Sequence, residues 1–282
     1  MINIVAGYFE NKNILEASKE ASSIEDLNVS IANSEQELIN AFKDPGVDAV
    51  VRGSLKSHEI MKFLKEYKKD NAINRATFIN TFDDEDFLED YEFLLAPVGI
   101  DEGKTIDERL EIAIQAALFL KSINKQPKIA ILAAGRKDDF GRTLGIDKNL
   151  KESEDLCEKI TQKLNDLDAF DNDSDDESRH FEVKNYYILI EKAIKEGNNI
   201  ILAPDGVTGN IIFRTLVLLN SWPSNGAVTL GIDEIFVDTS RDQSVEGYLR
   251  SIKLAYDLAK AKKEMSGKSF QVVARIAKFL LF

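Results

Sequence analysis

The chain has 282 residues, of which 30% are charged and 44% hydrophobic, and its formal net charge is −13. Nucleic-acid binding depends on clustered lysine and arginine, so this acidic balance argues against a nucleic-acid partner. The sequence has no apolar run of about 18 residues that would cross a membrane and no signal-peptide pattern at its N-terminus. Its single cysteine leaves no internal disulfide and indicates the reducing cytoplasm.

Short apolar runs rich in β-branched residues alternate with helical patterns from the first residue onward. Several runs lack polar alternation, which is typical of parallel strands that helices cover on both faces. We therefore expect an α/β fold with mainly parallel sheets. The predicted strands are Ile2–Ala6, Val29–Ala32, Ala49–Arg52, Ala76–Ile79, Phe93–Ala96, Lys128–Ala133, Asn199–Ala203, Ala227–Gly231 and Ile235–Val237.

Two of the predicted helices have clear sequence signals. Thr105 and Glu108 are spaced as a capping box, followed by a stripe of apolar residues at helical spacing, namely Ile106, Leu110, Ile114 and Ala117. A later helix repeats apolar residues every four positions, at Leu156, Ile160 and Leu164. Cys157 belongs to that stripe, and because no histidine partner is evident we interpret it as a small core residue.

The segment Asn165–Glu182 interrupts the alternation of strand and helix patterns with many acidic residues. Positions 1, 3, 5 and 12 of a calcium-binding loop template fall on Asp171, Asp173, Asp175 and Glu182. However, Asp176 stands where that loop needs glycine, and Ser178 replaces the usual apolar residue. The sequence therefore favours a solvated acidic surface loop over a calcium site, and we predict no metal centre.

The sequence has few of the residues and motifs that established catalytic and nucleotide-binding sites require. The chain has only two histidines, His58 and His180, which argues against a histidine-based zinc site or a Ser-His-Asp triad. It also lacks a GxxxxGK[ST] loop and a GxGxxG motif after the first strand. The chemistry is therefore expected in loops at the carboxyl ends of strands, where open α/β sheets bind their ligands.

Three such loops come after the opening strand, in chain order. Ser54 and Ser57 follow the strand that ends near Arg52, where their hydroxyls would cap the next helix or help to hold an anion, and capping is the commoner use. Arg136 follows the strand Lys128–Ala133. Asn210 and Arg214 lie in the stretch "NIILAPDGVTGNIIFR", where a strand runs into a glycine-containing loop and then into an apolar helix.

A further loop carries Ser240 and Arg241 just before a long amphipathic helix. The free N–H groups of that helix, its dipole and the Arg241 guanidinium would converge on one anion. The alternative is an ordinary helix cap provided by Asp242 or Ser244, with Arg241 in solvent.

Taken in order, these segments resemble the phosphate acetyl- and butyryltransferase family. The similar stretches are "VVRGSLKS", "PKIAILAAGR", "LAPDGVTGNIIFR" and "NGAVTLGIDEIFVDTSRDQSVEGYL", and they cover the chain from roughly Asp48 to the end of the helix over 245–260. The last two stretches are the most specific. Within this superfamily the chain is most similar to the MtxX type of methanogenic archaea, which carries a methyltransferase-subunit name without an established reaction.

The resemblance implies a two-domain fold of the isocitrate/isopropylmalate dehydrogenase type. It places residues 1–108 and 235–282 in domain I and residues 109–234 in domain II, with the active cleft between them. In the family's enzymes, CoA and an acyl phosphate bind there, and the CoA thiolate attacks the acyl carbon while phosphate departs. The implied ligand is an anionic small molecule, with CoA a candidate, and the implied partners are methyltransferase subunits and a second copy of the chain.

Several positions depart from the family's pattern. The aspartate that is the candidate thiol base falls on Gly247, and the neighbouring Glu246 points in another direction because a helix turns by about 100° per residue. Where the family has a glycine after its Ser-Arg pair, this chain has Asp242. The lysine of the family's Tyr-Lys pair is replaced by Arg214, and Lys62 lies one place out of register with a family arginine. The resemblance thus implies that this chain keeps the architecture of the family, while the residues that would carry out the family's chemistry differ.

Three functions are consistent with these residues. The first is an MtxX-type protein that binds an anionic small molecule, with the acyl-transfer chemistry altered or lost. The second is an active phosphate acyltransferase that moves a short acyl group between phosphate and CoA. The third is an interaction subunit that uses its apolar C-terminal stretch "SFQVVARIAKFLLF", although such a stretch more often docks on its own core.

Overall fold

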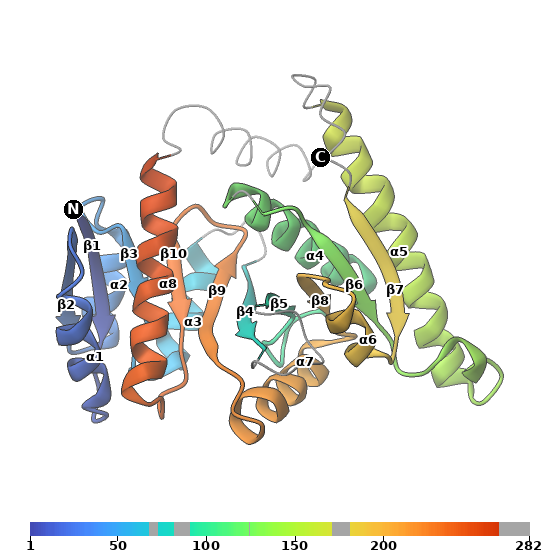
Figure 1. The fold of residues 1–282 in the computed structure, drawn as a ribbon, viewed down its shortest axis with the longest axis horizontal. Coiled ribbons are helices and arrows are strands. Elements are labelled where there is room, and N and C mark those ends of the chain that lie inside the picture. Colours follow the sequence, from blue (N-terminus) through green and yellow to red (C-terminus); the bar gives the residue numbers. More distant parts are fainter. Residues whose placement is uncertain (68–72, 82–90, 124, 171–180, 265–282) are drawn as a thin grey trace. The chain divides into compact units, whose positions relative to one another are not determined.

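The computed structural model describes residues 1–67, 73–81, 91–123, 125–170 and 181–264. These residues form two compact units. Among the described residues, unit 1 contains those up to Ile73 and those from Ser224 to Glu264, and unit 2 contains those from Asn74 to Pro223. Figure 1 shows the course of the chain, which passes from unit 1 into unit 2 and returns to unit 1 near the C-terminus.

Unit 1 is built on a mostly parallel sheet. The strand order is β2-β1-β3-β10-β9, in which β1 is parallel to both β2 and β3, β10 is parallel to β3, and β9 is antiparallel to β10. The strands are β1 (Ile2–Gly7), β2 (Leu27–Ala32), β3 (Ala49–Val51), β9 (Ser224–Leu230) and β10 (Ile235–Asp238). In the described part of this unit, the helices that cover the sheet are α1 (Asn13–Ala21), α2 (Glu35–Lys43), α3 (Ser57–Tyr67) and α8 (Val245–Glu264).

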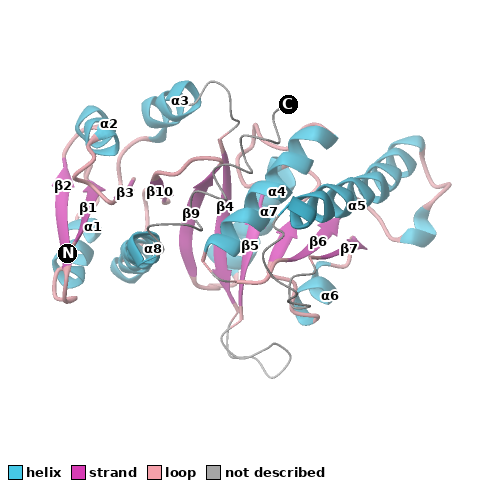
Figure 2. Ribbon diagram, turned by 90° about the horizontal axis from the view of Figure 1, so that it is seen from above, coloured by secondary structure: helices cyan, strands magenta, loops and turns pink. Residues whose placement is uncertain are grey.

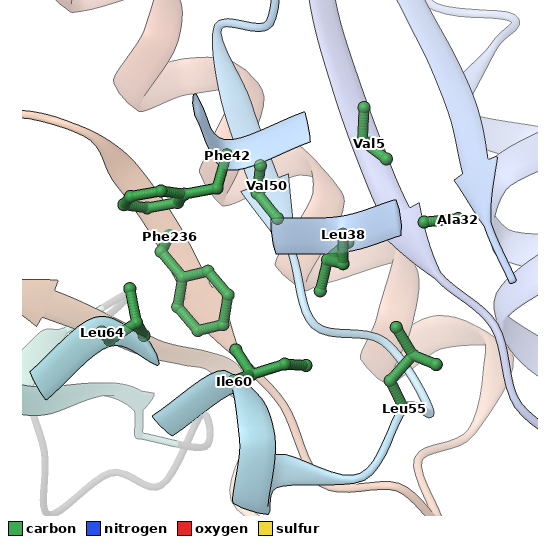
Figure 3. Packing of buried hydrophobic residues seen from close by; sticks show 9 residues of the cluster. All are labelled: Val5, Ala32, Leu38, Phe42, Val50, Leu55, Ile60, Leu64 and Phe236. Atoms are coloured by element: carbon green, nitrogen blue, oxygen red, sulfur yellow. The ribbon is translucent and has the colours of Figure 1, made fainter. Parts of the chain in front are cut away.

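The helices of unit 1 lie on the two faces of its sheet, as Figure 2 shows. Helices α1 and α8 pack against each other on one face, and α2 and α3 share the other. The core beneath α2 and α3 gathers buried residues from the sheet, from the loop after β3 and from these two helices. Figure 3 displays them: Val5, Ala32, Leu38, Phe42, Val50, Leu55, Ile60, Leu64 and Phe236. Phe42 meets Phe236 edge to face at 6.3 Å between ring centroids, so α2 is anchored on β10.

Unit 2 is built on a run of strands of which the first is antiparallel to its neighbour. Its order is β4-β5-β8-β6-β7, and β5, β8, β6 and β7 run parallel while β4 is antiparallel to β5. The strands are β4 (Asn74–Asn80), β5 (Glu92–Ala96), β6 (Lys128–Leu132), β7 (Glu182–Tyr187) and β8 (Ile200–Leu202). The helices are α4 (Ile106–Ser122), α5 (Leu144–Phe170), α6 (Ile190–Lys195) and α7 (Gly206–Phe213), followed by a π-helix (Arg214–Leu219).

The helix signals in the sequence are confirmed for the most part. The Thr105 hydroxyl accepts a hydrogen bond from the Glu108 N–H at 3.1 Å, so it caps α4 as predicted. Leu156, Ile160 and Leu164 are buried along α5. In α4, Ile114 and Ala117 are buried, whereas Ile106 and Leu110 are only half-buried.

Two expectations about the region around α5 were wrong. The predicted acidic loop over 165–182 is shorter, because α5 extends to Phe170 and Glu182 begins β7, a strand that the sequence did not indicate. Cys157 is half-buried rather than a core residue, and burial raises the pKa of its thiol. The calcium hypothesis falls mainly on residues 171–180, which lie outside the described residues.

The α/β class with mainly parallel strands, predicted from the sequence, is confirmed. Unit 2 begins at Asn74 and ends at Pro223, while the resemblance placed the domain boundaries at 108/109 and 234/235. Those bounds stay a prediction. Within the described ranges, no helix combines the length and apolar character that crossing a bilayer requires.

Candidate anion-binding site

The loops that follow β1, β3 and β10 meet at one edge of the sheet of unit 1, because these parallel neighbours end side by side. The Ser54 N–H donates to the Gly7 carbonyl at 3.0 Å, and the Phe9 N–H donates to the Ser54 hydroxyl at 2.7 Å. The Thr239 hydroxyl donates to the Gly53 carbonyl at 2.7 Å. These bonds tie the three loops into one rigid platform.

Arg52 clamps two of these loops from inside the protein. Its guanidinium forms an ion pair with Asp238 and also donates to the carbonyl oxygens of Leu55 and Thr239. The Arg52 and Asp238 side chains are only 8% and 13% exposed. Because this buried charge is fully engaged with protein groups, Arg52 holds the loops after β3 and β10 together and is not available to a ligand.

The loop after β10 is held by its backbone carbonyls. The Tyr248 hydroxyl donates to the carbonyls of Ser240 and Arg241 at 3.2 and 2.6 Å. The Asn11 amide donates to the Arg241 carbonyl at 2.9 Å, and the Asn13 amide to the Gln243 carbonyl at 2.9 Å. Tyr248 is fully buried, and burial raises its pKa to about 12, so it stays a neutral donor at physiological pH.

While the carbonyl groups of this loop accept these hydrogen bonds, the side chains of Ser240 and Arg241 are exposed to solvent. Lys56, in the loop after β3, is exposed too and lies 5.0 Å from the centroid of the Phe9 ring. The loops over 8–13, 52–58 and 238–244 contain four basic side chains (Lys12, Arg52, Lys56, Arg241) and three acidic ones (Glu10, Asp238, Asp242). This edge is therefore slightly basic in a chain of net charge −13, which suits an anionic ligand.

Helix α8 begins at this edge with its own cap. The Ser244 hydroxyl accepts from the Gly247 N–H at 3.1 Å, so the alternative of an ordinary cap by Ser244 is what the structure shows. Glu246 turns its carboxylate to its own backbone N–H and to the Ser244 hydroxyl, and these bonds hold the pKa of Glu246 below its ordinary value. Glu246 is thus part of the helix start and is poorly suited to take a proton from a thiol.

The predicted serines of the loop after β3 have different environments. Ser54 is 1% exposed and its oxygen accepts from Phe9, so it serves the packing of the loops. Ser57 is exposed at the first residue of α3. The structure thus gathers Ser54, Ser240 and Arg241 on adjoining loops of unit 1, with Ser57 three residues after Ser54.

In unit 2, the loops after β5 and β8 also meet at one edge of the sheet. Gly206 and Gly209, at the start of α7, pack closely against this edge. A Cβ atom on Gly206 would lie 1.6 Å from the Gly99 oxygen, and one on Gly209 would lie 1.9 Å from the Pro97 oxygen. Asp205 caps α7 by accepting from the Thr208 N–H at 2.8 Å. The helix start is therefore satisfied by a carboxylate of the chain itself.

Two buried charged residues support these loops of unit 2. Arg109 is 4% exposed and donates to the Pro204 carbonyl at 3.0 Å and to the Glu152 carboxylate at 2.8 Å. Glu102 is 9% exposed and accepts from Arg75 at 2.8 Å. Both charges are paired, as buried charges must be, and they fix the loops before α4 and α7.

The predicted site residues of unit 2 are Arg136, Asn210 and Arg214. Arg136 is exposed at the start of a short 3₁₀ turn after β6. Asn210 is half-buried and donates its amide to the Val98 carbonyl at 3.1 Å, while Arg214 is exposed at the end of α7. These three residues belong to the other unit from Ser54, Ser57, Ser240 and Arg241, and a ligand role for all seven stays a prediction.

Sequence reasoning missed the residues that shape the platform of unit 1, namely Asn11, Asn13, Arg52 and Tyr248. Their contacts join distant parts of the chain, such as Asn11 and the Arg241 carbonyl, which are 230 residues apart, and no local pattern signals them. The one available signal was the pair of asparagines directly after the first strand. In the part of the chain that the structure describes, no group of three or more His, Cys, Asp or Glu side chains is arranged to hold a metal ion.

Comparison with known proteins identifies relatives in methanogenic archaea. The chain is 33% identical over 260 residues to an uncharacterized methyltransferase of Methanocaldococcus jannaschii, covering 90% of this chain and 96% of the relative. It is 36% identical over 219 residues to the Methanosarcina barkeri protein named "Putative methyltransferase mtx subunit X", covering 77% of this chain and 71% of the relative. No family model matches the chain.

Solved structures with a similar fold include two phosphate acyltransferases. A branched-chain phosphotransacylase from Enterococcus faecalis aligns with a TM-score of 0.67 at 17% identity, covering 92% of this chain and 99% of that one. A phosphotransacetylase from Staphylococcus aureus aligns with a TM-score of 0.62 at 15% identity, covering 92% and 94%. At this level of identity the likeness shows a shared fold.

Proposed function

Since the chain belongs to the MtxX family of methanogen methyltransferase-subunit homologues, we propose that it serves methyl-transfer metabolism by binding an anionic small molecule. The ligand is CoA-like or phosphate-like, and it binds at the loops that follow β1, β3 and β10. The acyl transfer of the phosphotransacylases that share the fold is altered or lost in this chain.

The observation that carries the proposal is the way the loop after β10 is held. Three of its carbonyl groups accept hydrogen bonds from Asn11, Asn13 and Tyr248. The side chains of Ser240 and Arg241 are therefore presented to solvent from a fixed backbone. An arginine side chain that extends from a fixed backbone is suited to bidentate recognition of a phosphate or carboxylate.

The loss of acyl transfer is supported by the start of α8. Acyl transfer from an acyl phosphate needs a base near the CoA thiol, and the position that the resemblance assigns to it is Gly247. Glu246, one residue earlier, is already engaged with Ser244 and its own N–H.

The test combines a binding assay with an activity assay on purified full-length chain. Thermal unfolding with CoA and with inorganic phosphate is expected to give a rise in Tm, because a ligand that binds only the folded state stabilises it. Arg241→Ala should abolish that rise, whereas Arg142→Ala, which removes an exposed arginine of unit 2, should leave it unchanged. Acyl-CoA formation from acetyl, propionyl and butyryl phosphate should be absent.

Each part of the proposal has its own contradicting result. A Tm that neither anion raises, or an equal rise in wild type and Arg241→Ala, would contradict binding at this edge. Turnover of any short acyl phosphate would contradict the loss of acyl transfer and favour an active phosphate acyltransferase. In that case Arg241→Ala should remove the activity, and unchanged kcat/KM would exclude Arg241 from the site.

A further inference from the structure

Two neighbouring loops of unit 2 expose large apolar side chains where β6 and β7 end. Phe140 and Leu144, in the loop between β6 and α5, are 44% and 89% exposed, and Ile188, directly after β7, is 50% exposed. Because β6 and β7 are parallel neighbours, their carboxyl ends lie side by side, and Figure 1 shows the loop before α5 beyond the tip of β7. We call the exposed apolar and basic residues of these two loops the β6–α5 patch: Arg136, Lys137, Phe140, Arg142, Leu144 and Ile188.

The loop between β6 and α5 is held by its own acidic residues. The Asp139 carboxylate accepts from the Arg136 N–H at 2.8 Å and forms an ion pair with Arg142 at 3.1 Å. The Asp147 carboxylate accepts from the Gly141 N–H at 2.7 Å, which ties the middle of the loop to the first turn of α5. The apolar side chains of this loop are therefore displayed to solvent from a fixed backbone.

The backbone at the end of β7 adopts an unfavourable conformation just before the exposed Ile188. Tyr187 has a φ of +57°, which L residues other than glycine rarely adopt and which costs free energy. Its hydroxyl donates to the Glu154 carboxylate at 2.8 Å, and the Ile188 N–H donates to the Gly135 carbonyl at 3.0 Å, so neighbours on both sides hold this turn. Backbone strain that places a large apolar side chain in solvent does not help folding, and strain of this kind is concentrated at functional segments.

The charge of this region is opposite in sign to that of the whole chain. The segment 134–148 contains four basic residues (Arg136, Lys137, Arg142, Lys148) and three acidic ones (Asp138, Asp139, Asp147), whereas the chain has a net charge of −13. Asp139 and Asp147 are already engaged by N–H groups of the loop. The 27-residue helix α5 begins at Leu144, so the positive end of its dipole lies here too. Positive potential beside apolar side chains is complementary to a surface that is both acidic and apolar.

We propose that the β6–α5 patch binds a partner protein through an acidic segment that also carries apolar side chains. The three apolar residues of the patch expose on the order of 400 Å², and apolar patches of about 300–600 Å² are often functional. These residues would form the apolar centre of the contact, with Arg136 and Lys137 at its charged rim. The apolar centre favours a protein segment over a small inorganic anion, and the net charge of −13 opposes docking on an anionic membrane. The inference is independent of the ligand proposal, which concerns unit 1.

The test measures the binding of fluorescent synthetic peptides to the full-length chain by anisotropy. The acidic probe is a helical peptide of about 20 residues with a leucine stripe flanked by glutamates, and a second peptide has alanine in place of the leucines. The acidic probe should bind, and more weakly as salt rises. Leu144→Glu and Lys137→Glu should each raise its Kd more than about tenfold. Ile100→Glu, at a residue of unit 2 that is 67% exposed, and Lys253→Glu, at an exposed residue of α8, are the matched controls and should leave the Kd unchanged.

Circular dichroism of each variant should match wild type, because the substituted side chains are exposed. An acidic probe that does not bind, or that binds wild type and Leu144→Glu equally well, would overturn the proposal. Equal affinity for the leucine and alanine peptides would also overturn it, since the patch would then recognise charge alone. If instead wild type co-sediments with vesicles of phosphatidylglycerol and phosphatidylcholine and Leu144→Glu does not, the patch is a membrane-binding surface and the proposal is wrong.

Discussion

A Cβ atom on Gly53 would lie 1.9 Å from the carbonyl oxygen of Gly7, so the loops after β3 and β1 meet backbone to backbone. In the other direction, a Cβ on Gly7 would lie 2.3 Å from the Arg52 oxygen. Gly53 also has a φ of +61°, a conformation that L side chains rarely adopt. This contact brings the Phe9 N–H to Ser54 and thereby sets the shape of the candidate site.

Gly53→Ala is therefore expected to be strongly destabilising. The left-handed conformation costs about 1–2 kcal/mol, and displacement of the Gly7 backbone adds to it, so we expect the free energy of unfolding to fall by about 3 kcal/mol. Gly141→Ala is the control, since Gly141 has a φ of +90° and an added Cβ atom would have nothing within 4 Å, so it should show the conformational cost alone. Equal losses in urea unfolding would contradict the close approach.

The buried pair of Arg52 and Asp238 gives a second prediction. Arg52→Leu removes the buried ion pair with Asp238 and the hydrogen bonds that Arg52 donates to the carbonyls of Leu55 and Thr239. Removing one partner of a buried pair typically costs about 3–5 kcal/mol, and we expect a loss in that range from urea unfolding. Arg142→Ala breaks an exposed pair with Asp139 and should cost less than about 1 kcal/mol. A similar cost for both would mean that the Arg52 clamp does not stabilise the loops.

The acid stability of unit 2 should depend on Glu196. Its carboxylate accepts from Lys184 at 2.7 Å and from the Tyr186 hydroxyl at 2.5 Å, and these bonds lower the pKa of Glu196 to about 2 from an ordinary value of 4.5. A carboxyl whose pKa is depressed on folding contributes stability above its unfolded pKa and loses it as pH falls through the folded value.

Thermal unfolding of wild type and Glu196→Gln between about pH 2 and pH 7 tests this dependence. Wild type should have the higher Tm above about pH 4.5, and the difference should shrink towards about pH 2 as the carboxyl is protonated in both states. Glu191→Gln, an exposed change on α6, the helix that ends just before Glu196, serves as the control. A Tm difference that is independent of pH would show that these bonds do not involve the ionised carboxylate.

Much of the fold could be predicted from the sequence because its central strands are buried on both faces. The run that forms β5 is a case in point, since Phe93, Leu94, Leu95 and Ala96 are all fully buried and apolar. Strand β7 could not be found in this way. Its sequence "EVKNYY" buries only Tyr186, because β7 is the edge strand of its sheet, and the acidic residues before it favoured a loop.

The candidate site was predictable only in outline. The sequence located the loops after β3 and β10, since strand ends in an α/β sheet are recognisable from local pattern. It could not assign Ser54 to loop packing or Arg52 to a clamp, because those roles depend on Phe9 and Asp238, which are 45 and 186 residues away. Nor could it show that the Gly247 position faces the Gln243 side chain.

That contact leads to a last prediction, about the position where the resemblance places a catalytic base. A Cβ on Gly247 would lie 2.2 Å from Gln243 Oε1, so the Gln243 side chain fills the space that a larger residue would need. Alanine favours a helix over glycine by about 1 kcal/mol, yet Gly247→Ala must first displace this side chain.

We therefore expect Gly247→Ala to be neutral or destabilising in wild type and stabilising by about 0.5–1 kcal/mol in a Gln243→Ala background. The backbone of Gln243 stays in place in both backgrounds, because its carbonyl accepts from Asn13. Urea unfolding of wild type, the two single variants and the double variant gives the coupling energy directly. A coupling near zero would mean that Gln243 does not fill this space, and that a side chain at position 247 is accommodated without any change in its neighbour.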